Sequence, residues 1–380
     1  MRRPRLPGWS WAALTLLVGA GAAQAEPMFL SRQYTRCTTC HYSPTGGGLL
    51  TPYGRSLSRQ ELSGTGAAPQ PTQSGAPGQE EQFLFGLLGD SLHPVHIGVD
   101  LRPAYLSLDF SGTHLNQTML MTADVLAAYR SHGFTLYGEF GREPAVPGSQ
   151  QGAKITSYEY WASHESDDGY GFRLGRFLPA YGIRLADHTA YTRSNLGFDV
   201  SNEVYGLEFS HSSDNRLLQV SIGPGYADSL LHDDGRGSFT ATGRYQMDLS
   251  PKTALVFSAL YRNAARLVPQ NEASGVAFGL SPVSRLSSWT EADVEFEQGK
   301  TAYTVLNETS YEVSRGLWLK FSPQFRTDYG QPSGGSWRTV FEADLLPRTH
   351  FNVDVSFYRD KNRLTSLVSK TFLAQLHLYL

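Results

Sequence analysis

The last ten residues of the chain, Thr371 to Leu380, read Thr-Phe-Leu-Ala-Gln-Leu-His-Leu-Tyr-Leu. One face would hold Phe372, Ala374, Leu376, Leu378 and Leu380, and the other Thr371, Leu373, Gln375, His377 and Tyr379. Because successive side chains of a β-strand point to opposite faces, this order predicts a strand with one apolar face and one more polar face.

The same alternation recurs upstream, with charged residues on the second face. In one segment the first face holds Val353, Val355 and Phe357, and the second holds Asp354, Ser356 and Tyr358. In another the first face holds Trp337, Thr339, Phe341, Ala343 and Leu345, and the second holds Arg338, Val340, Glu342 and Asp344. In a third the first face holds Leu317, Leu319, Phe321 and Phe325, and the second holds Lys320, Gln324 and Arg326. Such segments fill residues 92–380 and are separated by clusters of turn-forming residues. We count about sixteen, an even number.

Strands with lipid outside and water inside explain this pattern best. Residues 92–380 are therefore predicted to form an all-β fold, a transmembrane antiparallel β-barrel of about 16 strands. A soluble β-sandwich or β-propeller fits less well, because the strands are long and lack a second apolar face. Aromatic residues near strand ends are expected to form interfacial girdles: Tyr105, Phe110, Tyr129, Trp161, Phe177 and Trp289.

Connections of two lengths support the barrel. The short ones include Ser131-His132, Ser166 to Gly169, Ser213-Asp214, Ser250-Pro251 and Pro347-Arg348, and the long ones include Gly141 to Gly152, Leu178 to Val200, Tyr226 to Arg236, Ala264 to Ala273 and Asp328 to Gly335. Short turns are expected on the periplasmic side and long loops outside the cell. Both ends of the barrel segment would then face the periplasm.

The beginning of the chain predicts export. Arg2, Arg3 and Arg5 precede an apolar run, and Ala23-Gln24-Ala25 follows it, so residues 1–25 are expected to be a cleaved signal peptide. Without these three arginines the formal charge would change from −3 to −6. A charge this mild gives no indication of a nucleic-acid partner.

The chain's two cysteines lie in Cys37-Thr38-Thr39-Cys40-His41. This spacing is typical of covalent attachment of one c-type haem, with two thioethers from the cysteines and His41 as the proximal iron ligand. A structural zinc site would need a fourth ligand. A thioredoxin-like redox motif would need a βαβ setting that the sequence does not offer, and a disulfide between residues this close would add little stability.

Residues 26–65 form the predicted haem segment, and residues 66–91 a linker rich in Pro and Gly. About forty residues are too few to bury a haem alone, so another surface must cover it.

Three residues are candidates for the distal iron ligand. Met28 is the only methionine between Glu26 and Asp90, although it could equally be a packing residue beside Phe29. His96 and His377 are expected to point inward near the periplasmic mouth, from the first and last strands, which pair to close a barrel. Either could complete the iron coordination if the haem segment caps or enters that mouth. Both could also be ordinary lumen histidines.

The chain resembles the fused outer-membrane monohaem cytochrome c-porins, which take part in extracellular electron transfer and include iron-oxidising members. The resemblance rests on the exported haem motif, on Leu50-Thr51-Pro52-Tyr53-Gly54-Arg55 after it, and on the porin-like remainder. It implies haem attachment at Cys37 and Cys40 with His41 as axial ligand. The chain is shorter than the iron-oxidising members and has a prominent Pro/Gly tether.

Other polar features invite functional interpretations. The carboxylates Asp293, Glu295, Glu297, Glu308, Glu342 and Asp344 are expected on one lumen wall, where they could bind a cation or simply line a wet channel. His232-Asp233-Asp234 is either a cation-capturing loop or a solvated turn. The connection from Arg176 to Arg193, with Arg184, Asp187 and His188, is either a surface loop or a loop folded into the channel.

These expectations combine into a functional hypothesis. The protein would carry electrons across the outer membrane of a Gram-negative bacterium, between an external donor or acceptor such as Fe(II) and a periplasmic soluble cytochrome or other carrier. The haem segment would lie on the periplasmic side or in the lumen. One alternative is a diffusion porin whose haem segment acts as a plug or sensor, and another is a structural role for the haem. The expected chemistry is electron transfer, which would include Fe(II) oxidation, and no motif indicates any other enzymatic activity.

Overall fold

The computed structural model describes residues 27–64, 94–142, 155–194, 196, 198, 203–224, 239–263 and 270–379. The expected signal peptide, the linker and the segment His232-Asp233-Asp234 lie outside these residues. Among the residues described, no helix is long and apolar enough to span a membrane.

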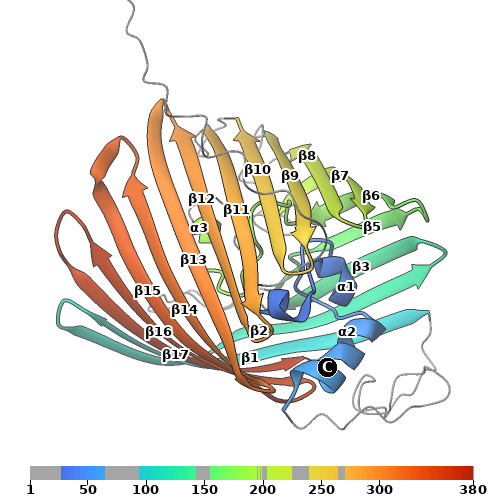
Figure 1. Cartoon of the computed structure of the whole chain (residues 1–380), viewed down its shortest axis with the longest axis horizontal. Helices are drawn as coiled ribbons and strands as arrows, with labels where there is room; N and C mark the ends of the chain where they lie inside the picture. The colour runs from blue at the N-terminus through green and yellow to red at the C-terminus, as the bar shows by residue number, and fades with distance from the viewer. Residues whose placement is uncertain are drawn as a thin grey trace, which may run out of the picture.

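The strands form one closed antiparallel barrel (Figure 1). They are β1 (Val95–Phe110), β2 (Thr113–Ser131), β3 (Phe134–Arg142), β4 (Ile155–Thr156), β5 (Tyr160–Glu165), β6 (Tyr170–Phe177), β7 (Val204–Ser213), β8 (Arg216–Pro224), β9 (Phe239–Ser250), β10 (Thr253–Arg262), β11 (Asn271–Val283), β12 (Leu286–Glu297), β13 (Lys300–Ser314), β14 (Leu317–Asp328), β15 (Gln331–Arg348), β16 (Phe351–Asn362) and β17 (Val368–Tyr379). Both β4 and β5 pair with β3, so they form one interrupted strand. The described residues therefore make sixteen strands, as predicted, and β17 pairs with β1.

The outer face of the barrel is apolar. On β15, Trp337 and Phe341 are 52% and 55% exposed, whereas on β14 the inward-facing Lys320 and Gln324 are buried. The predicted alternation is confirmed on these strands. A continuous apolar outer face suits contact with lipid chains.

Two details of the connections differ from the predictions. Asp328 to Gly335 is not a long loop: β14 and β15 meet at the two-residue turn Tyr329-Gly330, and the backbone N–H of Gly335 donates to the Asp328 carboxylate. The turn predicted at Pro347-Arg348 lies two residues later, at Thr349-His350. The turn at Ser111-Gly112 is also short, although it lies at the same end of the barrel as the long β6–β7 connection, so a short connection does not by itself identify the end of the barrel.

Residues 27–64, called the plug below, lie against the inner wall of the barrel. They comprise η1 (Pro27–Arg32), α1 (Cys37–Cys40), α2 (Pro52–Leu57) and η2 (Ser58–Leu62), which Figure 1 shows in blue beside the barrel wall. The Ser58 and Tyr379 hydroxyl oxygens lie 2.8 Å apart. The backbone N–H of Gly64 donates to the Leu346 carbonyl oxygen at 2.8 Å. Both contacts lie at one end of the barrel, where β17 ends and β15 turns into β16.

The connection between β6 and β7, called the inner loop, folds into the lumen as one of the two alternatives predicted. Its described part includes α3 (Tyr191–Ser194). The Tyr181 hydroxyl donates to Asp293 on β12 at 2.8 Å, and Arg338 on β15 donates to the Thr189 carbonyl oxygen at 2.7 Å. The loop therefore crosses to the opposite wall.

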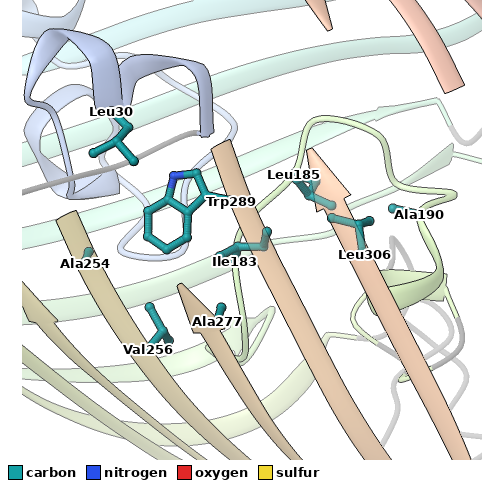
Figure 2. Packing of buried hydrophobic residues seen from close by; sticks show 9 residues of the cluster. All are labelled: Leu30, Ile183, Leu185, Ala190, Ala254, Val256, Ala277, Trp289 and Leu306. Atoms are coloured by element: carbon teal, nitrogen blue, oxygen red, sulfur yellow. The ribbon is translucent and has the colours of Figure 1, made fainter. Parts of the chain in front are cut away.

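Buried apolar clusters join the plug and inner loop to the wall. One contains Leu30 of the plug with Trp289 of β12 and residues of the inner loop (Figure 2). The prediction that Trp161, Phe177 and Trp289 form an interfacial girdle is wrong, because they face inward and are at most 5% exposed. The chain itself covers them, so they do not meet the lipid headgroups. The predicted girdle residues Tyr105, Phe110 and Tyr129 are exposed.

Candidate functional site

The Cys37–His41 segment forms a tight turn that the next residues brace. In α1 the backbone N–H of His41 donates to the Cys37 carbonyl oxygen at 2.8 Å, and the N–H of Thr51 donates to the Cys40 carbonyl oxygen at 2.8 Å. Between these bonds the chain reverses through residues 46–48, three glycines with positive φ, a conformation that glycine adopts without steric cost. His41 is thereby paired with Leu50.

The helix α2 packs directly on this turn. Thr51 caps α2 by accepting a hydrogen bond from the Gly54 N–H at 3.1 Å, and Pro52 occupies a first-turn position that favours proline. A Cβ at Gly54 would overlap the Cys40 carbonyl group. The Leu50-to-Arg55 stretch therefore positions Cys40.

The Cys40 thiol and the His41 imidazole of this turn are held neutral. Cys37 and Cys40 form no disulfide, and burial, followed by the neighbouring Cys37, raises the pKa of Cys40 to about 11. Reactive redox cysteines have a lowered thiol pKa instead. Burial and then the Arg184 guanidinium lower the pKa of His41 to about 4, and His377 contributes in the same direction.

The donor set of the turn fits a covalently attached haem. Two thiols stand three residues apart on one helical turn, and the buried Nδ1 atom of the neutral His41 ring has no hydrogen-bond partner among the described residues. Neutral imidazole is the form that binds iron. A cavity of about 50 Å³ touches Cys37 but neither Cys40 nor His41, so a macrocycle joined to both thiols requires neighbouring side chains to move.

Charged contacts fix the plug to several strands. Arg32 pairs with Glu312 on β13 at 2.5 Å, and Arg36 pairs with Asp248 on β9 at 3.3 Å. On the other side of the turn, the Ser43 hydroxyl donates to Glu159 at 3.0 Å. The turn is therefore held from opposite parts of the wall, which positions it more rigidly than one tether would.

The three candidate distal ligands have different surroundings. Met28 is buried in an apolar cluster with Leu57 and Trp318, near Cys40, which is the packing role anticipated for it. His96 faces inward and its ring lies 5.7 Å from the ring of Tyr42. His377 also faces inward, with Nε2 3.2 Å from the Asp100 carboxylate.

The predicted acidic wall is present. Asp293, Glu295 and Asp344 are buried and inward-facing, and Lys320 lies 3.2 Å from Asp344. Among the described residues no group of three or more histidine, cysteine or acidic side chains is arranged to hold a metal ion.

Sequence reasoning missed the wall residues that receive the plug. Asp248 and Glu312 are buried, and Tyr137, also inward-facing, accepts a hydrogen bond from the Leu49 N–H at 3.3 Å. Charged lumen residues are common in barrels, so these gave no distinct signal. Large aromatic residues on an inward face, such as Trp161, could have indicated a covered wall.

Comparison with known proteins relates the barrel to solved structures by fold alone. No family model matches the chain, and no curated protein matches it. OmpT of Vibrio cholerae is similar with a TM-score of 0.53 at 10% identity, over 75% of this chain and 97% of that one. A mutant porin of Rh. blastica gives 0.52 at 11%, over 75% and 100%. OprB of Pseudomonas putida gives 0.60 at 8%, over 75% and 94%. The chain thus has the porin-like fold of outer-membrane barrels.

Proposed function

We propose that the chain is an electron-transfer protein of the Gram-negative outer membrane, a porin-like barrel whose plug carries one covalently attached c-type haem. The observation that carries the proposal is the position of the Cys37–His41 turn against the inner wall, with two cysteines that form no disulfide and a neutral imidazole. The strand ends that the plug contacts would face the periplasm, where c-type haem is attached.

The residues of the turn would have defined roles. The thiols of Cys37 and Cys40 would each add across one vinyl group, so that no atom is lost, and His41 would bind the iron through a ring nitrogen. When bound, the haem supplies one-electron redox chemistry. The wall would exclude lipid from the turn, and the contacts of Arg32 and Arg36 with the strands would hold it in place.

Among the three candidate distal ligands, the surroundings favour His377. His377 is close enough to His41 to affect its pKa, and a ligating histidine commonly has a carboxylate on its other ring nitrogen, as Asp100 could provide here. Met28 is already packed among apolar side chains. Visible spectra of the reduced protein would test this, with His377→Gln expected to alter the low-spin bands and His96→Gln and Met28→Leu to preserve them. Unchanged bands in H377Q would refute this assignment.

Purified protein tests the haem itself. The mature chain should be a coloured, haem-stained band whose migration changes on heating, and the double variant Cys37→Ala/Cys40→Ala should be colourless while remaining heat-modifiable. A colourless natural protein would refute the proposal.

The fold comparisons favour a second candidate function. The similar barrels include a porin, and the inner loop enters the lumen as a constriction would. In this case the protein is a diffusion porin and the haem-bearing plug acts as a gate or sensor.

Liposomes that contain the protein and trapped oxidised cytochrome c separate the two candidates. If the protein is a conduit, each external Fe²⁺ should become Fe³⁺ and reduce one trapped cytochrome, without release of a small trapped dye. The C37A/C40A variant should abolish this transfer. A diffusion porin should release the dye, with or without the cysteines.

A further inference from the structure

A strongly cationic cavity lies beside the Cys37 turn. It is enclosed by the plug, the inner loop and the strands β8, β9 and β12, and it has a volume of about 50 Å³. Its lining includes Arg36, Arg184, Arg193 and Arg244 and, among the described residues, no aspartate or glutamate. Four guanidinium groups therefore surround a space that no carboxylate lines.

Nearby oxygens satisfy only part of this charge. Arg36 pairs with Asp248 and donates to Ser212, and Arg244 donates to the Gly182 carbonyl oxygen at 2.8 Å. Arg193 donates to the carbonyl oxygens of Leu185 and Phe198. A carbonyl or hydroxyl group accepts a hydrogen bond but does not neutralise a cation. Asp248 balances Arg36 directly, and Glu291, which lies outside the lining, attracts Arg244.

Two buried guanidinium nitrogens of the arginines that line this cavity have no hydrogen-bond partner among the described residues. They are Nη1 of Arg184 and Nε of Arg36. Arg184 lies against the Cys37 turn, since a Cβ built on Gly47 would stand 3.2 Å from its Nη2 atom. An unpaired N–H of a buried cation is costly, typically by more than a neutral one.

We propose that this cavity binds a carboxylate group, with Arg184 as the principal donor. A guanidinium presents a planar fork that matches the two oxygens of a carboxylate. A cavity of about 50 Å³ has room for roughly three or four water molecules, which is the size of one carboxylate group rather than of a whole nutrient molecule.

The carboxylate could come from a haem propionate or from a dissolved carboxylate. The first source rests on the proposed function, because it requires a haem at Cys37, whereas the second does not. Removal of the Arg184 charge would lower the reduction potential in the first case, since a cation near the haem favours the reduced state. In the second case, added succinate would stabilise the folded protein by binding to it.

The test compares wild type with Arg184→Gln, Arg184→Lys and Arg216→Gln, an exposed arginine on β8 that does not line the cavity. Reduction potential and the temperature of the heat-induced electrophoretic shift are measured with succinate and with sodium chloride of equal ionic strength. For a propionate, R184Q alone should lower the potential, and succinate should have no effect. For a dissolved carboxylate, succinate but not chloride should raise the shift temperature of wild type. R184Q should weaken the apparent succinate affinity about tenfold.

The outcomes separate this inference from the proposed function. A colourless wild type that succinate stabilises through Arg184 would refute the haem and support the site. If R184Q matches R216Q in both measurements, the site is refuted.

Should R184Q fail to give a heat-modifiable barrel, R184K decides, because it keeps the charge and loses the planar fork of the guanidinium. A dissolved carboxylate should then bind R184K more weakly than it binds wild type. If succinate stabilises a colourless R184K as much as it stabilises wild type, the site is also refuted. A haem-loaded R184K should keep the wild-type reduction potential. If R184K lowers the potential as much as R184Q does, the propionate assignment is contradicted.

Discussion

The two faces of the barrel wall share one alternating sequence pattern and meet different neighbours. Trp337 on β15 points outward and is 52% exposed, whereas Trp318 on the adjacent β14 points inward and is completely buried. Both are large aromatic residues on strands, and only one of them is covered by the protein's own chain. Trp318 lies beneath Met28, Leu57 and Leu62 of the plug.

The difference lies in what determines each face. The apolar outer face is selected by the surrounding lipid, which is the same along every strand, so a local pattern suffices to predict it. The inner face is selected by a particular partner segment. Leu30 of the plug contacts Trp289 more than 250 positions away in the sequence, and no local period encodes such a contact.

Polar residues of the inner face divide in the same way. Asp344 pairs with Lys320 on the neighbouring strand β14, so both partners belong to the wall. Asp248 on β9 pairs with Arg36 of the plug. The first pair would exist in an empty barrel, and the second requires the plug to be docked.

The largest expected effect comes from the buried tryptophan under the plug. Trp318→Ala should reduce the free energy of plug opening by about 3 to 5 kcal/mol, because it removes a large buried side chain and leaves a cavity. Amide hydrogen exchange of residues 27–64 in micelles measures this opening. Trp337→Ala is the matched control on the outer face and should leave plug exchange unchanged. Equal exchange in the two variants would contradict the docked position of the plug.

A smaller effect is expected from the ion pair between the plug and the wall. Asp248→Asn should weaken plug docking by about 2 kcal/mol, since it leaves the largely buried Arg36 without its carboxylate. Asp344→Asn makes the same change within the wall and should not alter plug exchange. If D344N exposes the plug as much as D248N, the loss reflects general loosening of the barrel.

The barrel could be predicted from the sequence because the alternation of side chains along a strand, and their exposure to lipid, can be recognised from neighbouring residues alone. The strand number and the closure of β1 on β17 are confirmed, and of the two alternatives for the inner loop the structure shows the one folded into the channel. The tight turn at Tyr329-Gly330 was missed because Gly330 and Gly335, both with positive φ, resemble loop residues in sequence. Glycines serve open loops and two-residue turns alike.

The sequence alone suggests the three residues of the candidate haem site, which stays a prediction, but it does not indicate their surroundings. The spacing of Cys37, Cys40 and His41 is a local signal. Arg184 reaches the same turn from the inner loop, over a hundred positions away, and only the folded barrel brings the two together. The inward direction of Trp161 was misread because an aromatic residue near a strand end is also typical of a membrane interface.

The glycine that packs on the Cys37–His41 turn should tolerate substitution less than a glycine of the open wall. Gly54→Ala should destabilise plug docking by about 1 to 2 kcal/mol, because its Cβ would overlap the Cys40 carbonyl group, although alanine favours helices over glycine by about 1 kcal/mol. Gly243→Ala is the control, since nothing lies within 4 Å of its added Cβ. Hydrogen exchange of the plug should increase in G54A only. A more protected plug in G54A would mean that helix propensity outweighs the overlap.

The smallest expected effect is the change in plug docking between pH 7 and pH 6. The pKa of His41 in the docked plug, about 4, lies below the ordinary histidine value of 6.5, so near pH 6 the undocked plug binds a proton that the docked plug does not bind. Docking is then strongest above pH 6.5 and weakens as the pH falls toward 4, by somewhat less than about 1 kcal/mol between pH 7 and 6. Iron ligation of His41 would keep the same sign, because a ligating imidazole is also neutral.

The urea concentration at which a protease cleaves the plug should fall between pH 7 and pH 6 in wild type and in His114→Gln, an exposed control. His41→Gln should show a flatter profile, and equal slopes in all three proteins would place the titrating group elsewhere.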